Sequence, residues 1–240
     1  MPSTLHNDPL GQAVFDYYTT KKTKRLKVYS NIVETDEIPV SYLFRTFNQM
    51  PPLEQKALKL CSGKVLDVGA AAGPHSLWLK AQSVEVFPID VSELAVKTLQ
   101  LQGFTAARQI NFFDLKTDKK FDTLLFLMNG IGIAGTLNKL PLFFEKCKQL
   151  LESNGQVILD SSDIIYLFGD EKTGYQIDLN ADYYGQVTYQ MSYGSIKGNQ
   201  FSWLFIDFNT LSHMAHQSGF KCELILKGTH FDYLARLSLQ

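Results

Sequence analysis

Cysteine is scarce in this sequence: only Cys61, Cys147 and Cys222 occur, and they lie far apart. No two of them have the short spacing of a metal-binding pair, and an odd number fits a disulfide framework poorly. We therefore expect free thiols and no metal site. Reduced thiols are typical of a cytoplasmic protein.

Long apolar runs are also missing. The most apolar stretch, residues 124–134, is broken by Gly130 and Gly132 and is too short to span a bilayer. The first eight residues are polar and lack the basic start and the apolar stretch of a signal peptide. We therefore expect a soluble intracellular protein without a membrane partner.

The sequence has no excess of charge of either sign, since its net charge is -1. A protein with this balance has no general attraction to nucleic acid. Its basic cluster, residues 21–27, is followed by Glu34, Asp36 and Glu37, which would neutralise it. Such a run is more often a solvated face than an RNA-binding surface, so the sequence argues against a nucleic-acid partner.

What is present is the composition of an ordinary globular protein, with 45% apolar and 20% charged residues over 240 positions. This length suits one α/β domain with a small appendage. Apolar residues at helical spacing predict three helices in residues 8–60, at 12–18, 39–47 and 53–60. We therefore expect residues 1–62 to form an N-terminal helical cap.

From Lys64 onward, short apolar runs alternate with amphipathic stretches. The runs predict five buried strands, at 65–68, 84–89, 105–110, 121–128 and 156–159. The stretches between them predict helices at 73–82, 92–102 and 136–151, with Ser92 as an N-cap. Strands and helices in alternation predict a doubly wound, mostly parallel sheet with helices on both faces.

The last third of the chain has a different pattern. Residues 175–193 alternate like antiparallel hairpin strands, so we expect a small β insertion at about 175–206. A helix is predicted at 207–219, and two closing strands are predicted at 221–227 and 231–239. With these two strands, the sheet of the main domain, residues 63–240, would have seven strands, and the last strand would be antiparallel.

The loop after the first buried strand carries the strongest functional signal. In Asp67-Val-Gly69-Ala-Ala71-Ala-Gly73, alternate positions are Gly, Ala and Gly, and a helix follows at once. Larger side chains there would hold a ligand away from the backbone amides and the helix N-terminus. The loop therefore predicts a nucleotide-type ligand.

The spacing narrows the choice of ligand. A dinucleotide site has its third glycine five residues after the first, where this sequence has Pro74, and no Gly-Lys-Ser/Thr follows as in a P-loop. Asp90 comes 21 residues after Gly69, at the end of the second predicted strand. A carboxylate there can accept hydrogen bonds from both ribose hydroxyls of an adenosine ligand, although it could instead cap a helix.

Residues 64–160 resemble the core of the class I S-adenosylmethionine (SAM)-dependent methyltransferases, whose first motif has the spacing acidic-x-Gly-x-Gly-x-Gly. The resemblance implies that SAM is the cofactor and S-adenosylhomocysteine (SAH) the product. Asp90 would then hold the ribose, Val91 would flank the adenine, and the cofactor site would also contain Asp67, Gly69, Ala70, Ala71, Gly73, His75, Asn111, Phe112, Met128 and Asn129.

Some of these residues could have other roles. Family members commonly place an Asp where this sequence has Asn111, so Asp114 is a possible substitute beside the adenine. His75 would face the methionine carboxylate or would simply be a polar residue at a helix start. Asn129 is harder to explain without a site, because an unpaired amide in an apolar run is costly.

A closer resemblance is to bacterial methyltransferases that carry Tyr-Leu-Phe-Arg before the loop, here Tyr42 to Arg45, and Leu-Met-Asn-Gly-Ile-Gly after the fourth strand, here Leu127 to Gly132. We expect Tyr42, Arg45, Asp160 and Trp203 to face the substrate, although a surface ion pair, loop hydrogen bonds and strand packing are alternatives.

The sequence thus predicts a SAM-dependent methyltransferase that acts on a small molecule. A general base is needed only if the acceptor must lose a proton, and no residue is assigned to that role. The alternatives are an NAD-dependent oxidoreductase, a non-catalytic SAM-binding protein, and an RNA or protein methyltransferase that uses the basic cluster.

Overall fold

The computed structural model describes residues 7–170, 172, 174–178 and 180–240. Residues 1–6 of the expected cap and residue 179 of the expected insertion therefore lie outside the described residues. The main sheet has seven strands in the order β13-β14-β7-β6-β3-β4-β5. Its strand order reverses at β3, as in a doubly wound fold. The predicted mostly parallel sheet is confirmed.

The chain divides into two compact units. The first unit contains residues 1–50, 62–118 and 188–201. The second contains residues 51–61, 119–187 and 202–240.

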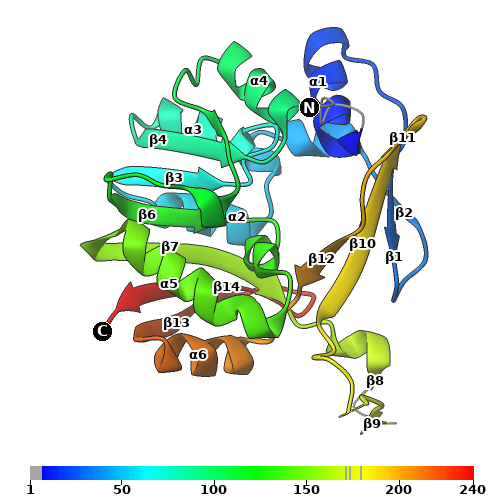
Figure 1. The fold of residues 1–240 in the computed structure, drawn as a ribbon, viewed down its shortest axis with the longest axis vertical. Helices are drawn as coiled ribbons and strands as arrows, with labels where there is room; N and C mark the ends of the chain where they lie inside the picture. The colour runs from blue at the N-terminus through cyan, green and yellow to red at the C-terminus, as the bar shows by residue number, and fades with distance from the viewer. Residues whose placement is uncertain (1–6, 171, 173, 179) are drawn as a thin grey trace. The chain divides into compact units, whose positions relative to one another are not determined.

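Parallel strands form the centre of the first unit (Figure 1). β3 (Lys64–Val68) pairs with β4 (Glu85–Asp90), and Val68 lies opposite Ile89, so both strands end at the same level. The next strand, β5, contains only Arg108–Gln109, which is shorter than predicted. The reason is local: Phe104 and Ala107 are held in turns and pack into a small apolar cluster.

Helices α3 (Pro74–Ala81) and α4 (Glu93–Leu101) follow β3 and β4 and pack against β4. Ser92 is the N-cap of α4, as predicted, because its Oγ accepts a hydrogen bond from the backbone N–H of Ala95 at 2.9 Å. Helix α1 (Pro9–Thr20) packs along α4.

Strand β1 (Leu26–Ser30) belongs to a second sheet, in which it lies between β2 (Asp36–Ile38) and β10 (Gln186–Tyr193). The helices predicted at 12–18 and 39–47 leave residues 26–38 without a predicted element, so both of these strands were missed. The buried Leu26 lies opposite Tyr193, so these strands depend on a distant partner rather than on a local pattern.

The rest of the expected cap is helical, but in short pieces. Residues 39–47 form two 3₁₀ helices, η2 (Val40–Phe44) and η3 (Phe47–Gln49), instead of one α-helix. Helix α2 (Pro52–Leu60) follows and agrees with the predicted third helix.

The second unit is built on β6 (Phe121–Phe126) and β7 (Leu151–Ser162), which are parallel. β14 (Asp232–Leu239) runs antiparallel to β7 and to β13 (Phe220–Lys227), so the closing strand pair is confirmed. Val157, Ile158 and Leu159 are all fully buried, which shows that both faces of β7 are covered.

β7 is much longer than predicted because Asn154 and Gly155 lie inside the strand rather than in a turn. The pairing with β6 shifts between Phe121 and Thr123 to accommodate the extra residues. A Cβ at Gly155 would come within 2.9 Å of the Phe121 carbonyl oxygen, so glycine is required here by a close approach.

The helices of this unit are α5 (Leu140–Leu150), which the 3₁₀ turn η6 (Leu137–Lys139) precedes, and α6 (Phe208–Gln217). α6 agrees with the helix predicted at 207–219, and Asp207 is its N-cap, because its Oδ1 accepts from the Thr210 N–H at 2.9 Å. β9 (Gly174–Tyr175) pairs with β8 (Gly169–Asp170), which precedes the expected β insertion, and within the insertion β11 (Ile196–Lys197) pairs with β10. The expected antiparallel strands are present in β10 and β11, which turn at Gly194, whereas β9 and β10 are not partners.

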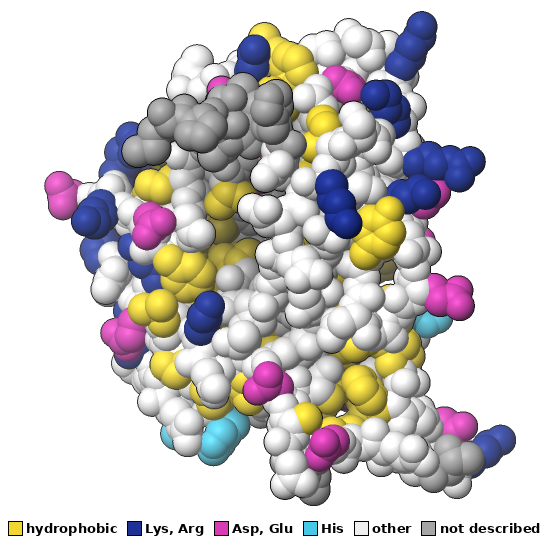
Figure 2. Space-filling model, turned by 45° about the vertical axis from the view of Figure 1, so that its right-hand side comes forward, with side chains coloured by type: hydrophobic (Ala, Val, Ile, Leu, Met, Phe, Trp, Pro, Cys, Tyr) yellow, Lys and Arg dark blue, Asp and Glu magenta, His cyan; other side chains and the backbone are white. Residues whose placement is uncertain are grey.

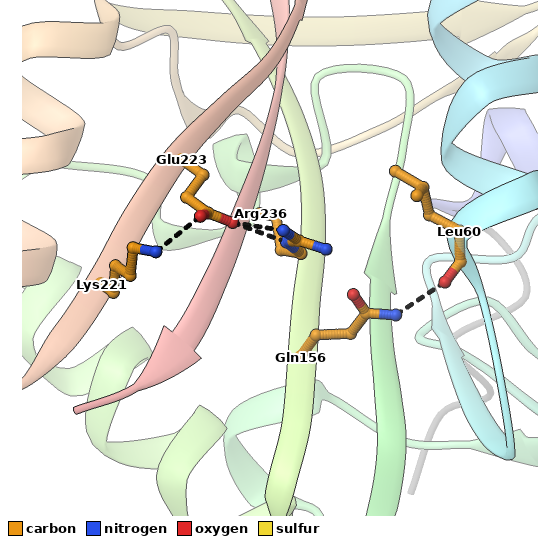
Figure 3. Close-up of polar contacts among 5 residues, drawn as sticks. All are labelled: Leu60, Gln156, Lys221, Glu223 and Arg236. Carbon is orange, nitrogen blue, oxygen red and sulfur yellow. Dashed lines mark hydrogen bonds and ion pairs between the residues drawn. The ribbon is translucent and has the colours of Figure 1, made fainter.

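Polar side chains join elements at the edges of this unit (Figure 3). Gln156 Nε2 donates to the Leu60 carbonyl at 2.7 Å and so ties the end of α2 to β7. On the closing strands, Glu223 accepts from Lys221 at 2.7 Å and from Arg236 Nε at 2.8 Å. Hydrogen bonds from Lys221 and Arg236 lower the pKa of Glu223.

A chain of aromatic rings forms the core of the second unit. Phe143 packs edge-on against Phe126 at 5.0 Å and against Phe144 at 5.6 Å, and Phe144 packs against Phe220 at 5.8 Å. All four side chains are fully buried. Large rings in contact contribute much of the burial energy of a core. Among the described residues, no helix is long and apolar enough to cross a membrane.

The neighbours Leu142 and Phe143 on α5 provide a matched test of this core. Phe143→Ala should lower the free energy of unfolding by about 3–5 kcal/mol, because it leaves a cavity among the rings. Leu142→Ala should lower the free energy of unfolding by no more than about 0.5 kcal/mol, because the Leu142 side chain is 59% exposed. Urea unfolding followed by circular dichroism measures both, and equal effects would contradict this description of the core.

Candidate functional site

The loop after β3 has left-handed backbone at alternate positions. The φ angle is +74° at Gly69, +47° at Ala71 and +77° at Gly73. Glycine adopts this conformation freely, whereas alanine pays roughly 1–2 kcal/mol. The backbone conformation therefore favours glycine at positions 69 and 73, a reason that adds to the ligand access expected from the sequence.

The two glycines of this loop differ in what surrounds them. A Cβ on Gly73 would lie 2.5 Å from Cδ2 of Leu99, so this glycine allows the loop to pack on α4. A Cβ on Gly69 would meet no atom within 4 Å, and Gly69 is exposed. The open face of the loop is thus at Gly69, where a ligand can approach the backbone.

Asp90 holds this loop in place. The backbone N–H groups of Gly69 and Ala70 both donate to the Ile89 carbonyl, and that of Ala71 donates to Asp90 Oδ2 at 2.9 Å. The other oxygen, Oδ1, accepts from the Ser92 N–H at 2.8 Å. Each carboxylate oxygen can accept a further hydrogen bond, so Asp90 can serve the loop and a ligand together.

Burial raises the pKa of Asp90 to about 6, against the opposing effect of the two backbone hydrogen bonds. A second carboxylate, Asp8, adds to this rise through charge repulsion. Asp8 accepts from the Gly11 N–H at 2.8 Å and from Ser92 Oγ at 2.5 Å, so it caps α1 and joins it to the start of α4. Sequence reasoning missed Asp8, although an Asp directly before Pro9 is a helix-start signal.

Asp67 and His75 lie inside the protein. Asp67 Oδ2 accepts from Ser76 Oγ at 2.6 Å, which ties the end of β3 to the first turn of α3. Burial raises the pKa of Asp67, and the nearby His75 opposes that rise. Asp67 is 2% exposed and His75 is 5% exposed, so both face the interior beside the loop.

The residues predicted beside the adenine differ in exposure. Val91, directly after Asp90, is 65% exposed, which is unusual for an aliphatic side chain. Asn111 caps a short 3₁₀ helix, η4 (Phe112–Asp114), through its Oδ1, which accepts from the Phe113 N–H at 2.9 Å. Phe112 is buried, and Asp114 is exposed.

In the second unit, Met128 and Asn129 follow β6. Both residues are left-handed, with φ angles of +64° and +58°, a conformation that is much rarer for Met than for Asn. Met128 is 40% exposed. The 3₁₀ helix η5 (Gly130–Ala134) follows, and the Gly130 N–H donates to Asp160 Oδ1 at 3.1 Å.

Three of the predicted substrate-facing residues have defined neighbours within their own units. The Arg45 guanidinium carbon lies 4.3 Å from the centre of the Tyr42 ring, and Arg45 is 5% exposed. Trp203, on β12 (Phe201–Leu204), packs against Gly132, where a Cβ would come within 2.0 Å of the indole nitrogen.

Several aromatic residues of the insertion and of β14 have structural contacts. The hydroxyl of Tyr183 donates to Asp207, and that of Tyr184 donates to Asp163, both at 2.7 Å. Tyr233 donates to the Ile206 carbonyl at 2.8 Å, and burial raises the pKa of its hydroxyl well above the usual value. Tyr233 is therefore poorly suited to act as a base.

The structure brings Gly69, Ala71, Asp90 and Val91 together at the carboxyl ends of β3 and β4. Doubly wound sheets bind ligands outside the carboxyl ends of their strands, at the point where the strand order reverses. In the chain described, no group of three His, Cys, Asp or Glu side chains is placed to hold a metal ion.

Comparison with solved structures identifies a similar enzyme. A SAM-dependent methyltransferase from Bacteroides fragilis, solved in complex with S-adenosyl-L-homocysteine, is 48% identical, with a TM-score of 0.92 over 98% of this chain and 95% of that chain. No family model matches the sequence, and no curated protein matches it.

More distant structures share the fold alone. A sugar N-methyltransferase from Streptoalloteichus is 15% identical, with a TM-score of 0.56 over 78% of this chain and 85% of that chain. An amino pentose methyltransferase from Micromonospora echinaspora, solved with SAM bound, is 13% identical, with a TM-score of 0.55 over 81% of this chain and 94% of that chain.

These comparisons favour a methyltransferase over an NAD-dependent oxidoreductase or a non-catalytic SAM-binding protein. They agree with the class I resemblance of residues 64–160. Since nearly half of its residues are shared with the Bacteroides fragilis enzyme along almost the whole chain, this protein belongs to the SAM-dependent methyltransferase family, as an enzyme that uses SAM as its methyl donor.

Proposed function

We propose that this methyltransferase acts on a small-molecule acceptor in the cytoplasm and that it binds SAM at the carboxyl ends of β3 and β4. The observation that carries the binding site is the open face of Gly69 beside the buried carboxylate of Asp90. An open left-handed loop next to a carboxylate suits a ligand with an amino-acid part and a ribose.

The described residues fit the cofactor part by part. The exposed backbone at Gly69, with Ala70, Ala71 and Gly73, would lie along the methionine part of SAM, as the family resemblance implies. Asp90 would accept hydrogen bonds from the ribose hydroxyls, and the exposed Val91 would be covered by the adenine, so that its side chain leaves water on binding.

The remaining cofactor candidates have weaker support. Asn111 can still accept a hydrogen bond from the adenine amino group, because a carbonyl oxygen accepts two and the Phe113 N–H uses one. Phe112 would lie beside the adenine ring, and Met128 would lie near the sulfonium. Asp67 and His75 would act mainly by holding the loop from inside.

SAM supplies an electrophilic methyl group, so the chain's own residues need mainly to orient the acceptor and to exclude water. We assign Tyr42, Arg45, Asp160 and Trp203 to the acceptor side. Asp160 accepts from the Gly130 N–H, so its carboxylate is held next to η5.

The charges favour a small molecule over RNA. Figure 2 shows one face of the molecule, on which Lys and Arg side chains are interspersed with acidic and neutral ones. Part of the basic cluster has partners: Arg25 lies 3.3 Å from Glu37, and Lys21 lies over the Tyr17 ring. RNA-binding surfaces usually gather unpaired basic residues.

The acceptor class can be tested by following a labelled methyl group. The enzyme with methyl-labelled SAM should transfer label to a pool of small metabolites and leave total RNA and unfolded protein unlabelled. Asp90→Ala, which should no longer bind SAM well, is the negative control. Label in RNA that disappears at high salt would favour the RNA alternative instead.

Gly69→Ala tests the open face of the loop. The added Cβ meets no protein atom, but it would project where the ligand approaches, so SAH binding should weaken by roughly tenfold or more. The left-handed backbone adds about 1–2 kcal/mol of strain. Calorimetric titration with SAH measures the affinity.

Gly174→Ala is the matched control for Gly69→Ala. Its φ angle is +79° and its added Cβ also meets no atom within 4 Å, so it carries the same backbone strain. It should leave SAH affinity unchanged. Equal losses in both variants would show that strain, not ligand contact, explains the result.

Asp90→Ala should weaken SAH binding by roughly 1.5–3 kcal/mol, because hydrogen bonds between the carboxylate and the ribose are lost. Asp118→Ala removes an exposed carboxylate from the same unit and should bind SAH like the wild type. An Asp90→Ala variant with wild-type affinity would rule out this ribose contact.

The same residue predicts a pH dependence. The pKa of Asp90 is about 6 in the protein without ligand. SAH affinity should therefore be level above about pH 7 and fall below about pH 6, by up to tenfold per unit. Asp90→Ala should lose this dependence; a profile unchanged in the variant would point to another group.

The stability of the ligand-free protein should depend on pH in the opposite direction to SAH affinity. Because the pKa of Asp90 in the folded protein lies above its ordinary value of 3.8, the stability it contributes is complete below about pH 4 and is lost as the pH rises through about 6. Binding and stability should therefore change in opposite directions in this pH range.

A further inference from the structure

The turn after β6 is conformationally unfavourable. Met128 and Asn129 are both left-handed, and Met128 has an unbranched apolar side chain that cannot offset this with a local hydrogen bond. Such conformations persist only where the surrounding structure holds them, and they gather at functional sites. A neighbouring group must therefore hold this turn in place.

The side-chain amide of Asn129 provides that hold. Its Oδ1 accepts from Ser161 Oγ at 3.1 Å and from the Ser162 N–H at 3.2 Å. Its Nδ2 donates to the Leu204 carbonyl at 3.2 Å. Because a carbonyl oxygen accepts about two hydrogen bonds, protein donors already saturate the amide oxygen. This oxygen is therefore occupied by the fold rather than by a ligand.

Ser161 extends the same network. Its Oγ donates to Asn129 and accepts from the Ile206 N–H at 3.0 Å, while the Ile206 carbonyl accepts from Tyr233. Ser161 is 1% exposed, and Leu204 and Ile206 are fully buried. Buried hydrogen bonds of this kind are costly to break, so residues 204–206 are fixed to the end of β7 and to the turn.

Trp203 directly precedes this fixed segment. Its indole rests on Gly132, where a Cβ would come within 2.0 Å of Nε1 and 2.2 Å of Cε2. The position of the indole is thus bounded by Gly132, and the residue next to Trp203 in the chain, Leu204, is held at its carbonyl by Asn129. A change at Asn129 releases the second of these constraints.

We infer that Asn129 is a positioning residue for the acceptor side of methyl transfer: through Leu204 it sets the place of the Trp203 indole, and through Ser161 and Ser162 it keeps Met128 exposed in its left-handed conformation. The inference rests on the proposed function only in assigning Trp203 and Met128 to the site. It revises the expected role of Asn129, whose amide oxygen serves the protein instead of SAM.

The two tryptophans allow a direct test, since Trp78→Phe leaves Trp203 as the sole indole fluorophore. In that background, Asn129→Gly removes the amide and keeps a residue that adopts positive φ freely. Trp203 emission should shift to longer wavelength, and its quenching by acrylamide should rise. Gly132→Ala, whose Cβ must displace the indole, gives the reference signal for a moved Trp203.

Two further variants separate the amide from the turn. Met128→Gly removes the backbone strain but leaves the amide, so Trp203 emission should stay as in the parent. Asn129→Asp has the same shape and keeps the acceptor oxygen, but it loses the donor to Leu204, so Trp203 should move as in Asn129→Gly. If Asn129→Gly does not fold, Asn129→Asp takes its place in the test. Unchanged emission in Asn129→Asp, or an equal shift in Met128→Gly, would overturn the inference.

SAH titration distinguishes this inference from the proposed function. Asn129→Gly should weaken SAH binding much less than Asp90→Ala does. Parent-like Trp203 emission together with lost SAH binding would make Asn129 a direct cofactor contact and overturn the inference. If the parent itself fails to bind SAH, the proposed cofactor site fails, while the fluorescence result stands on its own.

Discussion

The parallel pairing of β3 with β4 is the constraint on which the proposed cofactor site depends. With Val68 opposite Ile89, both strands end at one level, and the Ile89 carbonyl receives two N–H groups from the loop. The next residue, Asp90, then reaches the Ala71 N–H. One register therefore fixes the loop conformation, the place of the carboxylate and the exposure of Val91. A shift by one residue would reverse every side chain and separate these groups.

Residues 64–102 could be predicted well from sequence because their signals are local. Strand, glycine loop, N-cap and helix follow one another directly, and the pattern alone placed Gly69 in the loop and Asp90 at the end of the second strand. β1 was missed because it is only five residues long and its partner strand β10, which contains Tyr193, is far away in the chain. Asn154-Gly155 is a dipeptide typical of turns, but glycine there serves a close approach inside β7.

The polar partners of the site were the least predictable part. Asp8 contacts Ser92 across 84 positions, and Asn129 contacts Leu204 across 75, distances over which composition and periodicity carry no information. The sequence did indicate that Asn129 was unusual in an apolar run. It gave no indication that the unusual feature was a left-handed turn fixed by a buried serine. The sequence was enough to identify the unusual polar residues, whereas their hydrogen-bond partners could be identified only from the folded structure.

The two outer strands of the main sheet differ from its interior in a way that affects association with other chains. At one edge β5 has only two residues, which offer few backbone groups for pairing. At the other edge β13 carries Lys221, Glu223 and Lys227. Short or charged edges are poor templates for a foreign strand. The sheet is thus protected from edge-to-edge aggregation at both of its margins, even though the strands between them are strongly apolar.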